Sequence, residues 1–124
     1  MKKKIYISLP ITGREKKARE HADLVKAALS RQGWEAISPF DIYAGKQPTY
    51  GDYLGHDIAA MLNCDAVMFC NGFASSCGCR IEHEVLRLYN RDNKEHRVIV
   101  PHYESPELEN LVRETKTIEP ITLT

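Results

Sequence analysis

The chain has 124 residues, of which 43% are hydrophobic and 27% charged, and its 17 Lys and Arg residues balance its 17 Asp and Glu residues. A chain of this length forms one domain with its own core, which we expect to span residues 1–124. Without a basic excess, no nucleic acid polymer is expected as a partner. No apolar run reaches membrane-spanning length and no signal peptide precedes the first strand, so we expect a cytoplasmic protein without a membrane partner.

The hydrophobic pattern predicts strands that alternate with helices. Residues 3–10 are an apolar, isoleucine-rich run, which indicates a buried first strand. A predicted amphipathic helix over residues 14–34 follows, and Gly33 is placed to end it. The helix has its apolar stripe at Ala18, Ala22, Val25 and Leu29. The later predicted elements are a strand at 35–39, a helix at 50–64, a strand at 65–71, a helix at 75–93, a strand at 96–101, a short helix at 105–114 and an edge strand at 115–124.

Strands separated by helices of this length predict βαβ units with right-handed crossovers. The expected fold is therefore α/β, a single-domain flavodoxin- or Rossmann-like three-layer sandwich with a four- or five-stranded parallel sheet. Ligands of such folds bind at the carboxyl ends of the strands. We therefore expect the loops Pro10–Gly13, Pro39–Gly51 and Asn71–Gly78, which leave that edge, to share one pocket.

The four cysteines are Cys64, Cys70, Cys77 and Cys79, and no export signal accompanies them, so reduced thiols are expected rather than disulfides. Cys77 and Cys79 form a C-x-C with His83 four residues further on, but the second pair of a typical zinc site is missing. We favour small residues in a tight turn, and expect neither a metal nor a cofactor.

Two loops offer groups that suit an anion or a sugar. The loop 10–13 has a glycine and the Thr12 hydroxyl before a helix, but it is neither a Walker loop nor a Rossmann fingerprint, and a turn without a ligand remains an equal interpretation. The loop 71–78 offers Ser75, Ser76 and Gly78 at a helix start. Ser76 is also suited to cap that helix, and both roles are compatible.

Two carboxylates lie beside apolar helix faces. Asp57 lies at the edge of the stripe of Leu54, Ile58, Met61 and Leu62, and Glu82 lies near the positive end of its helix, which favours an ionised side chain. Carboxylates at a core boundary are usually hydrogen-bonded, and perturbed carboxylates gather at functional sites. Both are therefore catalytic candidates, and a solvated helix surface is the alternative.

Three segments together resemble the nucleoside 2-deoxyribosyltransferase superfamily, and most of all its small DUF4406-type branch of unassigned function. They are "YISLPITG", "GDYLGHDIAAMLNCDAV" and "SSCGCRIE", and the resemblance covers roughly residues 3–90. The superfamily carries its nucleophilic glutamate in an S-x-G-x-x-x-E segment, matched by Ser76, Gly78 and Glu82. Its assisting aspartate lies eight residues before the one that opens the third strand, a spacing that Asp57 and Asp65 have.

The resemblance implies cleavage or transfer of an N-glycosidic bond on a nucleoside or nucleoside 5'-monophosphate, through a covalent glycosyl ester on Glu82 with help from Asp57. It implies a homodimer or a higher even homo-oligomer. The alternatives are a non-catalytic nucleotide-binding or sensing module and an NAD-cleaving glycohydrolase. The substrate contacts expected on this basis are Tyr6, Ser8, Pro10, Thr12, Gly13, Ser76 and Gly78.

Overall fold

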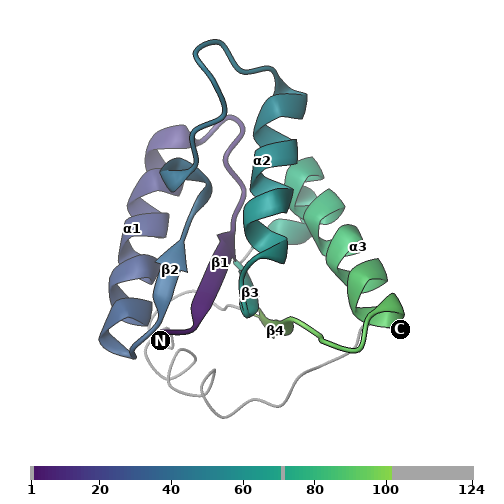
Figure 1. Ribbon diagram of the computed structural model, residues 1–124. Coiled ribbons are helices and arrows are strands. Elements are labelled where there is room, and N and C mark those ends of the chain that lie inside the picture. Colours follow the sequence, from purple (N-terminus) through teal and green to yellow (C-terminus); the bar gives the residue numbers. More distant parts are fainter. Residues whose placement is uncertain (1, 71, 102–124) are drawn as a thin grey trace.

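The computed structural model describes residues 2–70 and 72–101 (Figure 1). Four parallel strands form a sheet in the order β2-β1-β3-β4, a flavodoxin-like arrangement. The expected α/β class with parallel strands is confirmed, whereas the predicted helix at 105–114 and edge strand at 115–124 lie outside the described residues. The strands are β1 (Lys4–Ser8), β2 (Glu35–Ile37), β3 (Ala66–Phe69) and β4 (Val98–Pro101), and the helices are α1 (Glu15–Arg31), α2 (Tyr50–Leu62) and α3 (Cys77–Asp92).

Helix α1 covers one face of the sheet. Its predicted stripe is confirmed, because Ala18, Ala22, Val25 and Leu29 are all buried, and they pack with Ile5 and Ile7 of β1. The helix ends as the sequence indicates: Gly33 has a φ of 90° and its N–H donates to the Ser30 carbonyl. Only a residue that tolerates positive φ closes a helix in this way at low cost.

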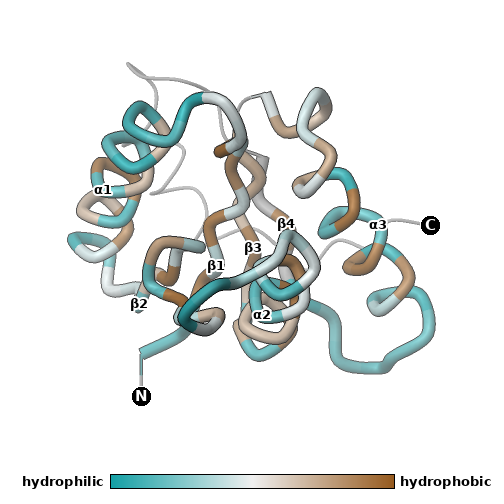
Figure 2. The backbone as a smooth tube through the Cα atoms, turned by 90° about the horizontal axis from the view of Figure 1, so that it is seen from above, coloured by the Kyte–Doolittle hydropathy of each residue, from teal (hydrophilic) through white to brown (hydrophobic). Residues whose placement is uncertain are grey.

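Helices α2 and α3 cover the opposite face, so the sheet lies between α1 and these two helices (Figure 2). Met61 of α2 and Leu86 of α3 pack there against Tyr6 and Phe69. All four residues of β3 are buried, as expected for a strand covered on both faces. Among the described residues, none of the helices has the length and apolar character needed to span a bilayer.

Two 3-10 turns lie inside the loops at the carboxyl edge of the sheet, at Pro39–Asp41 and Phe73–Ser75. The first is fixed by a capping box, in which Ser38 and Asp41 exchange hydrogen bonds, and Lys26 of α1 pairs with Asp41 at 2.8 Å. Helix α2 starts with a second capping box, between Thr49 and Asp52. These local bonds hold the loop after β2 and the start of α2 in place at the edge where ligands are expected.

Candidate active site

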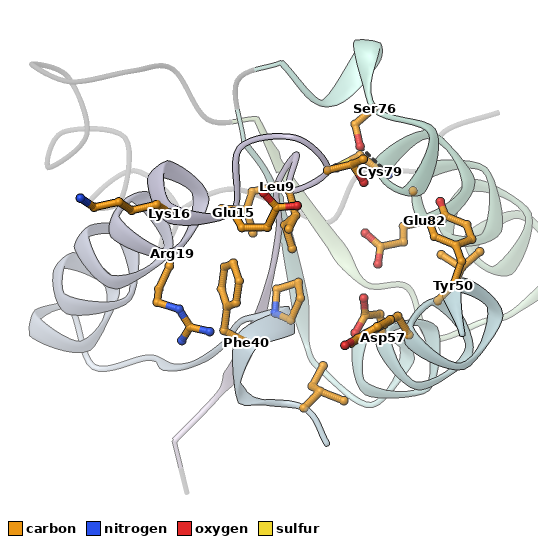
Figure 3. Close-up of a pocket in the computed structure, with 17 residues that line it drawn as sticks. Leu9, Glu15, Lys16, Arg19, Phe40, Tyr50, Asp57, Ser76, Cys79 and Glu82 are labelled. Atoms are coloured by element: carbon orange, nitrogen blue, oxygen red, sulfur yellow. Dashed lines mark hydrogen bonds between the residues drawn. The ribbon is translucent and has the colours of Figure 1, made fainter. Parts of the chain in front are cut away.

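A cavity of about 840 Å³ lies at this edge, between α1 and the pair α2–α3 (Figure 3). Residues from all three predicted loops line it, so the expected convergence holds for the described part of those loops. The loops contribute Ile11, Thr12, Pro39, Phe40, Ile42, Tyr50, Ser76 and Gly78; the remaining lining residues are Leu9, Glu15, Lys16, Arg19, Tyr53, Leu54, Asp57, Cys79 and Glu82.

Glu82 is a buried carboxylate in the cavity wall, only 4% exposed. It lies in the second turn of α3, a helix that Ser76 caps by accepting a bond from the Cys79 N–H at 3.3 Å, which confirms the predicted cap. Two hydroxyls of β1 hold its two oxygens: Tyr6 donates to Oε2 at 2.8 Å and Ser8 donates to Oε1 at 2.7 Å. The carboxylate is therefore fixed in one orientation.

Burial decides the charge balance at Glu82. It raises the pKa of the carboxyl, while the bonds from Ser8 and Tyr6 lower the pKa again. The sequence predicted that the helix start would favour the ionised form, whereas the net pKa shift of Glu82 is upward because burial removes water from the carboxyl. Burial, and then the negative charge of Glu82, raises the pKa of Tyr6 well above its usual value, so Tyr6 remains a donor.

Asp57 faces Glu82 across the same corner of the cavity (Figure 3). It belongs to a face of α2 that Tyr50, Tyr53 and Leu54 share, at the i, i+3, i+4, i+7 spacing of one helix side. Burial, followed by the negative charge of Glu82, raises the pKa of Asp57 to about 7. Because the charge of Glu82 is one cause of this shift, the pair favours a protonated Asp57 beside an ionised Glu82, which is the arrangement that an acid and a nucleophile need.

The predicted substrate contacts fall into two groups. Thr12, Ser76 and Gly78 line the cavity. Tyr6 and Ser8 are not among the lining residues; they are fully buried, and both donate to the Glu82 carboxylate. Because residues 6 and 8 share one face of a strand, both reach the same carboxylate.

Pro10 and Gly13 are also not among the lining residues, so their predicted contact with a substrate stays a prediction. The Pro10 ring lies beside Gly72, where an added Cβ would be 3.5 Å from its Cγ. Gly13 is exposed and has a φ of 77°, so it serves the turn into α1. From the loop 10–13, Ile11 and Thr12 are therefore the residues that line the cavity.

Several lining residues were not predicted as site residues from the sequence. Glu15, Lys16 and Arg19 lie on one face of the first turns of α1, and this helical spacing was a usable signal. Phe40 lies in the turn after β2, where no periodic pattern marks it. Its ring has the Arg19 guanidinium 4.4 Å from its centroid.

The cysteines are free thiols; Cys77 is exposed and the other three are buried. Burial raises the pKa of Cys64 to about 11 and the pKa of Cys70 to about 12. Cys79 lines the cavity, and burial raises its pKa as well, which disfavours a thiolate nucleophile. In the described ranges, no group of three or more His, Cys, Asp or Glu side chains is arranged to hold a metal ion.

Comparison with known proteins shows the family of the chain. The family model described as "Domain of unknown function (DUF4406)" matches residues 3–91, a range that includes Tyr6, Ser8, Asp57 and Glu82. No curated protein matches the chain significantly.

Proposed function

Because the chain belongs to the DUF4406 family, a domain of unknown function, we propose an activity from the site itself: cleavage or transfer of the N-glycosidic bond of a nucleoside or nucleoside 5'-monophosphate. We further propose that the chain shares the chemistry of the nucleoside 2-deoxyribosyltransferase superfamily, which its motifs resemble. The reaction passes through a covalent glycosyl ester on Glu82.

One observation carries the proposal. A buried glutamate, fixed by hydroxyl donors at 2.7 and 2.8 Å, shares a cavity with an aspartate whose pKa is raised to about 7. A merely structural carboxylate at this depth would be expected to pair with a cation, but Glu82 is bonded by two neutral hydroxyls. Neutral donors orient a carboxylate without cancelling its charge, and a nucleophile needs that charge.

In the first step, a Glu82 oxygen attacks the anomeric carbon of the sugar. The carbon–nitrogen bond breaks, its electron pair leaves with the base, and protonated Asp57 gives its proton to the departing nitrogen. The negative charge of Glu82 is one cause of the raised pKa of Asp57. The two carboxyl groups therefore prepare one another for the roles of nucleophile and acid.

In the second step, the charge relation reverses. Glu82 is now a neutral ester, so the pKa of Asp57 falls and Asp57 acts as a base. It takes a proton from water, or from the nitrogen of an acceptor base, and the new bond to the anomeric carbon releases Glu82 as a carboxylate. Two displacements at one carbon retain its configuration. The sum is hydrolysis with water, or exchange of bases with a second base.

The rest of the cavity suits the same class of substrate. Thr12 and Ser76 present hydroxyls that can bond sugar oxygens, and Gly78 leaves room at the start of α3. Phe40, Tyr50 and Tyr53 supply aromatic faces for a planar base. Polar groups converge at the carboxylate corner and apolar ones surround it, as is common in small-molecule sites.

The direct experiment measures release of free base by chromatography from a panel of nucleosides, their 5'-monophosphates and NAD. Glu82→Gln should abolish nearly all release, because a nucleophile commonly contributes several orders of magnitude. Asp57→Asn should lose about 10² to 10⁴ of the rate. The matched control is Glu84→Gln, an exposed glutamate on the same helix that pairs with Arg87, and it should keep the parental rate.

Parental release by Glu82→Gln would refute the covalent mechanism. Release of nicotinamide from NAD alone would move the activity to dinucleotide cleavage. If no substrate were cleaved and yet a nucleotide raised the melting temperature, the chain would be a nucleotide-binding module.

A further inference from the structure

The cavity has charges of opposite sign on opposite walls. Asp57 and Glu82 lie on the α2–α3 wall, and Lys16 and Arg19 lie on the α1 wall (Figure 3). The carboxyl groups are buried or half-buried, whereas both basic side chains are at the exposed rim. The cavity thus has acidic groups in its interior and basic groups at its opening.

The two basic side chains are not committed to acidic partners. Within residues 2–70 and 72–101, Lys16 forms no ion pair or hydrogen bond, and the contact that Arg19 makes is with the Phe40 ring at 4.4 Å. Glu15 shares their wall, but it turns back to accept the Gly13 N–H at 3.3 Å. The Arg19 guanidinium is therefore available to a ligand in the cavity, and Lys16, whose side chain extends away from the cavity in Figure 3, has no acidic partner among the described residues that holds it there.

We propose that Lys16 and Arg19 bind a phosphoryl group of the substrate, so that this site takes a nucleoside phosphate in preference to a nucleoside. The inference rests on the proposed function, which places the sugar at Glu82. It adds the substrate class and the residues that select it.

Electrostatics decide which wall takes the phosphoryl group. A phosphate carries about −1.5 to −2 charges at neutral pH, so the ionised Glu82 corner repels it. The opposite wall attracts it, and a guanidinium fork matches phosphate oxygens in geometry as well as in charge. The Phe40 ring supports the Arg19 guanidinium, which reduces the freedom that binding would have to remove. The Lys16 side chain is flexible and can reach the same phosphoryl group.

The start of α3 is a less suitable phosphate site, although Ser76 and Gly78 line the cavity there. The Cys79 N–H, a donor that an anion at the helix start would need, already donates to the Ser76 hydroxyl. The Tyr50 hydroxyl lies over Gly78, at 3.3 Å from where a Cβ would be. The Tyr50 hydroxyl therefore takes up part of the space in front of the helix start, so the α1 wall is favoured.

The test measures binding without catalysis. In the Glu82→Gln background, titration calorimetry at low salt compares each of the four deoxynucleosides with its 5'-monophosphate. The monophosphate should bind at least about tenfold more tightly, and Arg19→Gln should remove most of that preference, as expected for hydrogen bonds to a charged group. Lys16→Gln should remove part of it.

Two further variants check the sign of the effect. Lys17→Gln removes a charge from an exposed residue of α1 outside the cavity lining, and should leave the preference unchanged. Glu15→Gln removes a negative charge from the α1 wall, so it should tighten monophosphate binding. Added salt should weaken the monophosphate and leave the nucleoside unaffected, because exposed charges are screened.

Three results would overturn the phosphoryl site. They are equal affinity for nucleoside and monophosphate, no binding of either ligand, and an equal loss of the monophosphate preference in Lys17→Gln and Arg19→Gln. Its failure is distinguishable from failure of the proposed reaction. If the parent cleaves nucleosides and monophosphates with equal KM, the reaction stands and the phosphoryl site falls. If the monophosphate preference depends on Arg19 and yet the parent releases no base, the site stands and the reaction falls.

Discussion

Replacing Tyr6 with phenylalanine tests how strongly β1 holds the Glu82 carboxylate. The change keeps the fully buried ring and removes the hydroxyl that donates to Oε2 at 2.8 Å. A hydrogen bond to a charged, buried acceptor contributes about 1.5–3 kcal/mol, against about 0.5–1.5 kcal/mol for a neutral one. Tyr6→Phe should therefore lower the free energy of unfolding by the larger amount only where Glu82 is ionised.

The pH dependence gives this prediction its sign. Because the pKa of Glu82 is raised on folding, its contribution to stability is present below the unfolded value near 4.5 and is lost as the pH rises through the folded pKa. Removing a donor to the ionised form raises the folded pKa further. The stability difference between parent and Tyr6→Phe should therefore be small at pH 4 and should grow as Glu82 loses its proton.

Urea unfolding, followed by the fluorescence of Trp34, measures this difference. Trp34 is the single tryptophan and is 8% exposed, so unfolding changes its surroundings. Tyr43→Phe is the matched control, because Tyr43 is 75% exposed and its change should stay within about 0.5 kcal/mol. In a Glu82→Gln background, Tyr6→Phe should cost much less, since the charged acceptor is gone. The same loss at pH 4 and pH 8, together with no coupling to Glu82, would refute the reasoning.

The remaining predictions concern stability and assembly. Since the pKa of Asp57 is raised from 3.8 to about 7, its contribution to stability is complete below about pH 4 and is lost by about pH 7. Asp57→Asn should therefore raise the free energy of unfolding at pH 8 by about 1–2 kcal/mol relative to the parent, after solvent screening. A lower free energy of unfolding in urea at pH 8 would contradict this. Gly55→Ala in α2 meets no atom within 4 Å and should add about 0.5–1 kcal/mol to the unfolding free energy, measured in urea. Gly72→Ala should instead cost about 1–2 kcal/mol, because Gly72 has a φ of 88°; equal effects of the two alanines would show that backbone conformation does not decide them. Tyr53 is 51% exposed and belongs to an aromatic surface, which we expect to form the interface of a homodimer or higher even oligomer. A monomer in light scattering at micromolar concentration would count against this assembly.

The sequence determined the order of the elements and most of their inner faces. Apolar residues at a spacing of about 3.6 identified the buried side of α1, because residues at that spacing lie on one side of a helix. Gly33 marked the end of the helix, because few residues other than glycine adopt positive φ. An unbroken apolar run identified β3 as a strand covered on both faces. Likewise, Asp57 and Glu82 could be selected as candidates, because a carboxylate beside an apolar stripe is unusual wherever the helix packs.

The surroundings of those carboxylates depend on how the elements pack. Tyr6 and Ser8 lie 76 and 74 positions from Glu82 in the chain, so no local pattern indicated that their hydroxyls meet its two oxygens. The same holds for the opposed α1 wall, where Arg19 contacts Phe40 from the loop after β2. Contacts of this kind depend on how the layers are stacked and in which register. Burial, and with it the pKa of Asp57 near 7, depends on water excluded by several elements at once, and the spacing of residues along one helix does not contain that information.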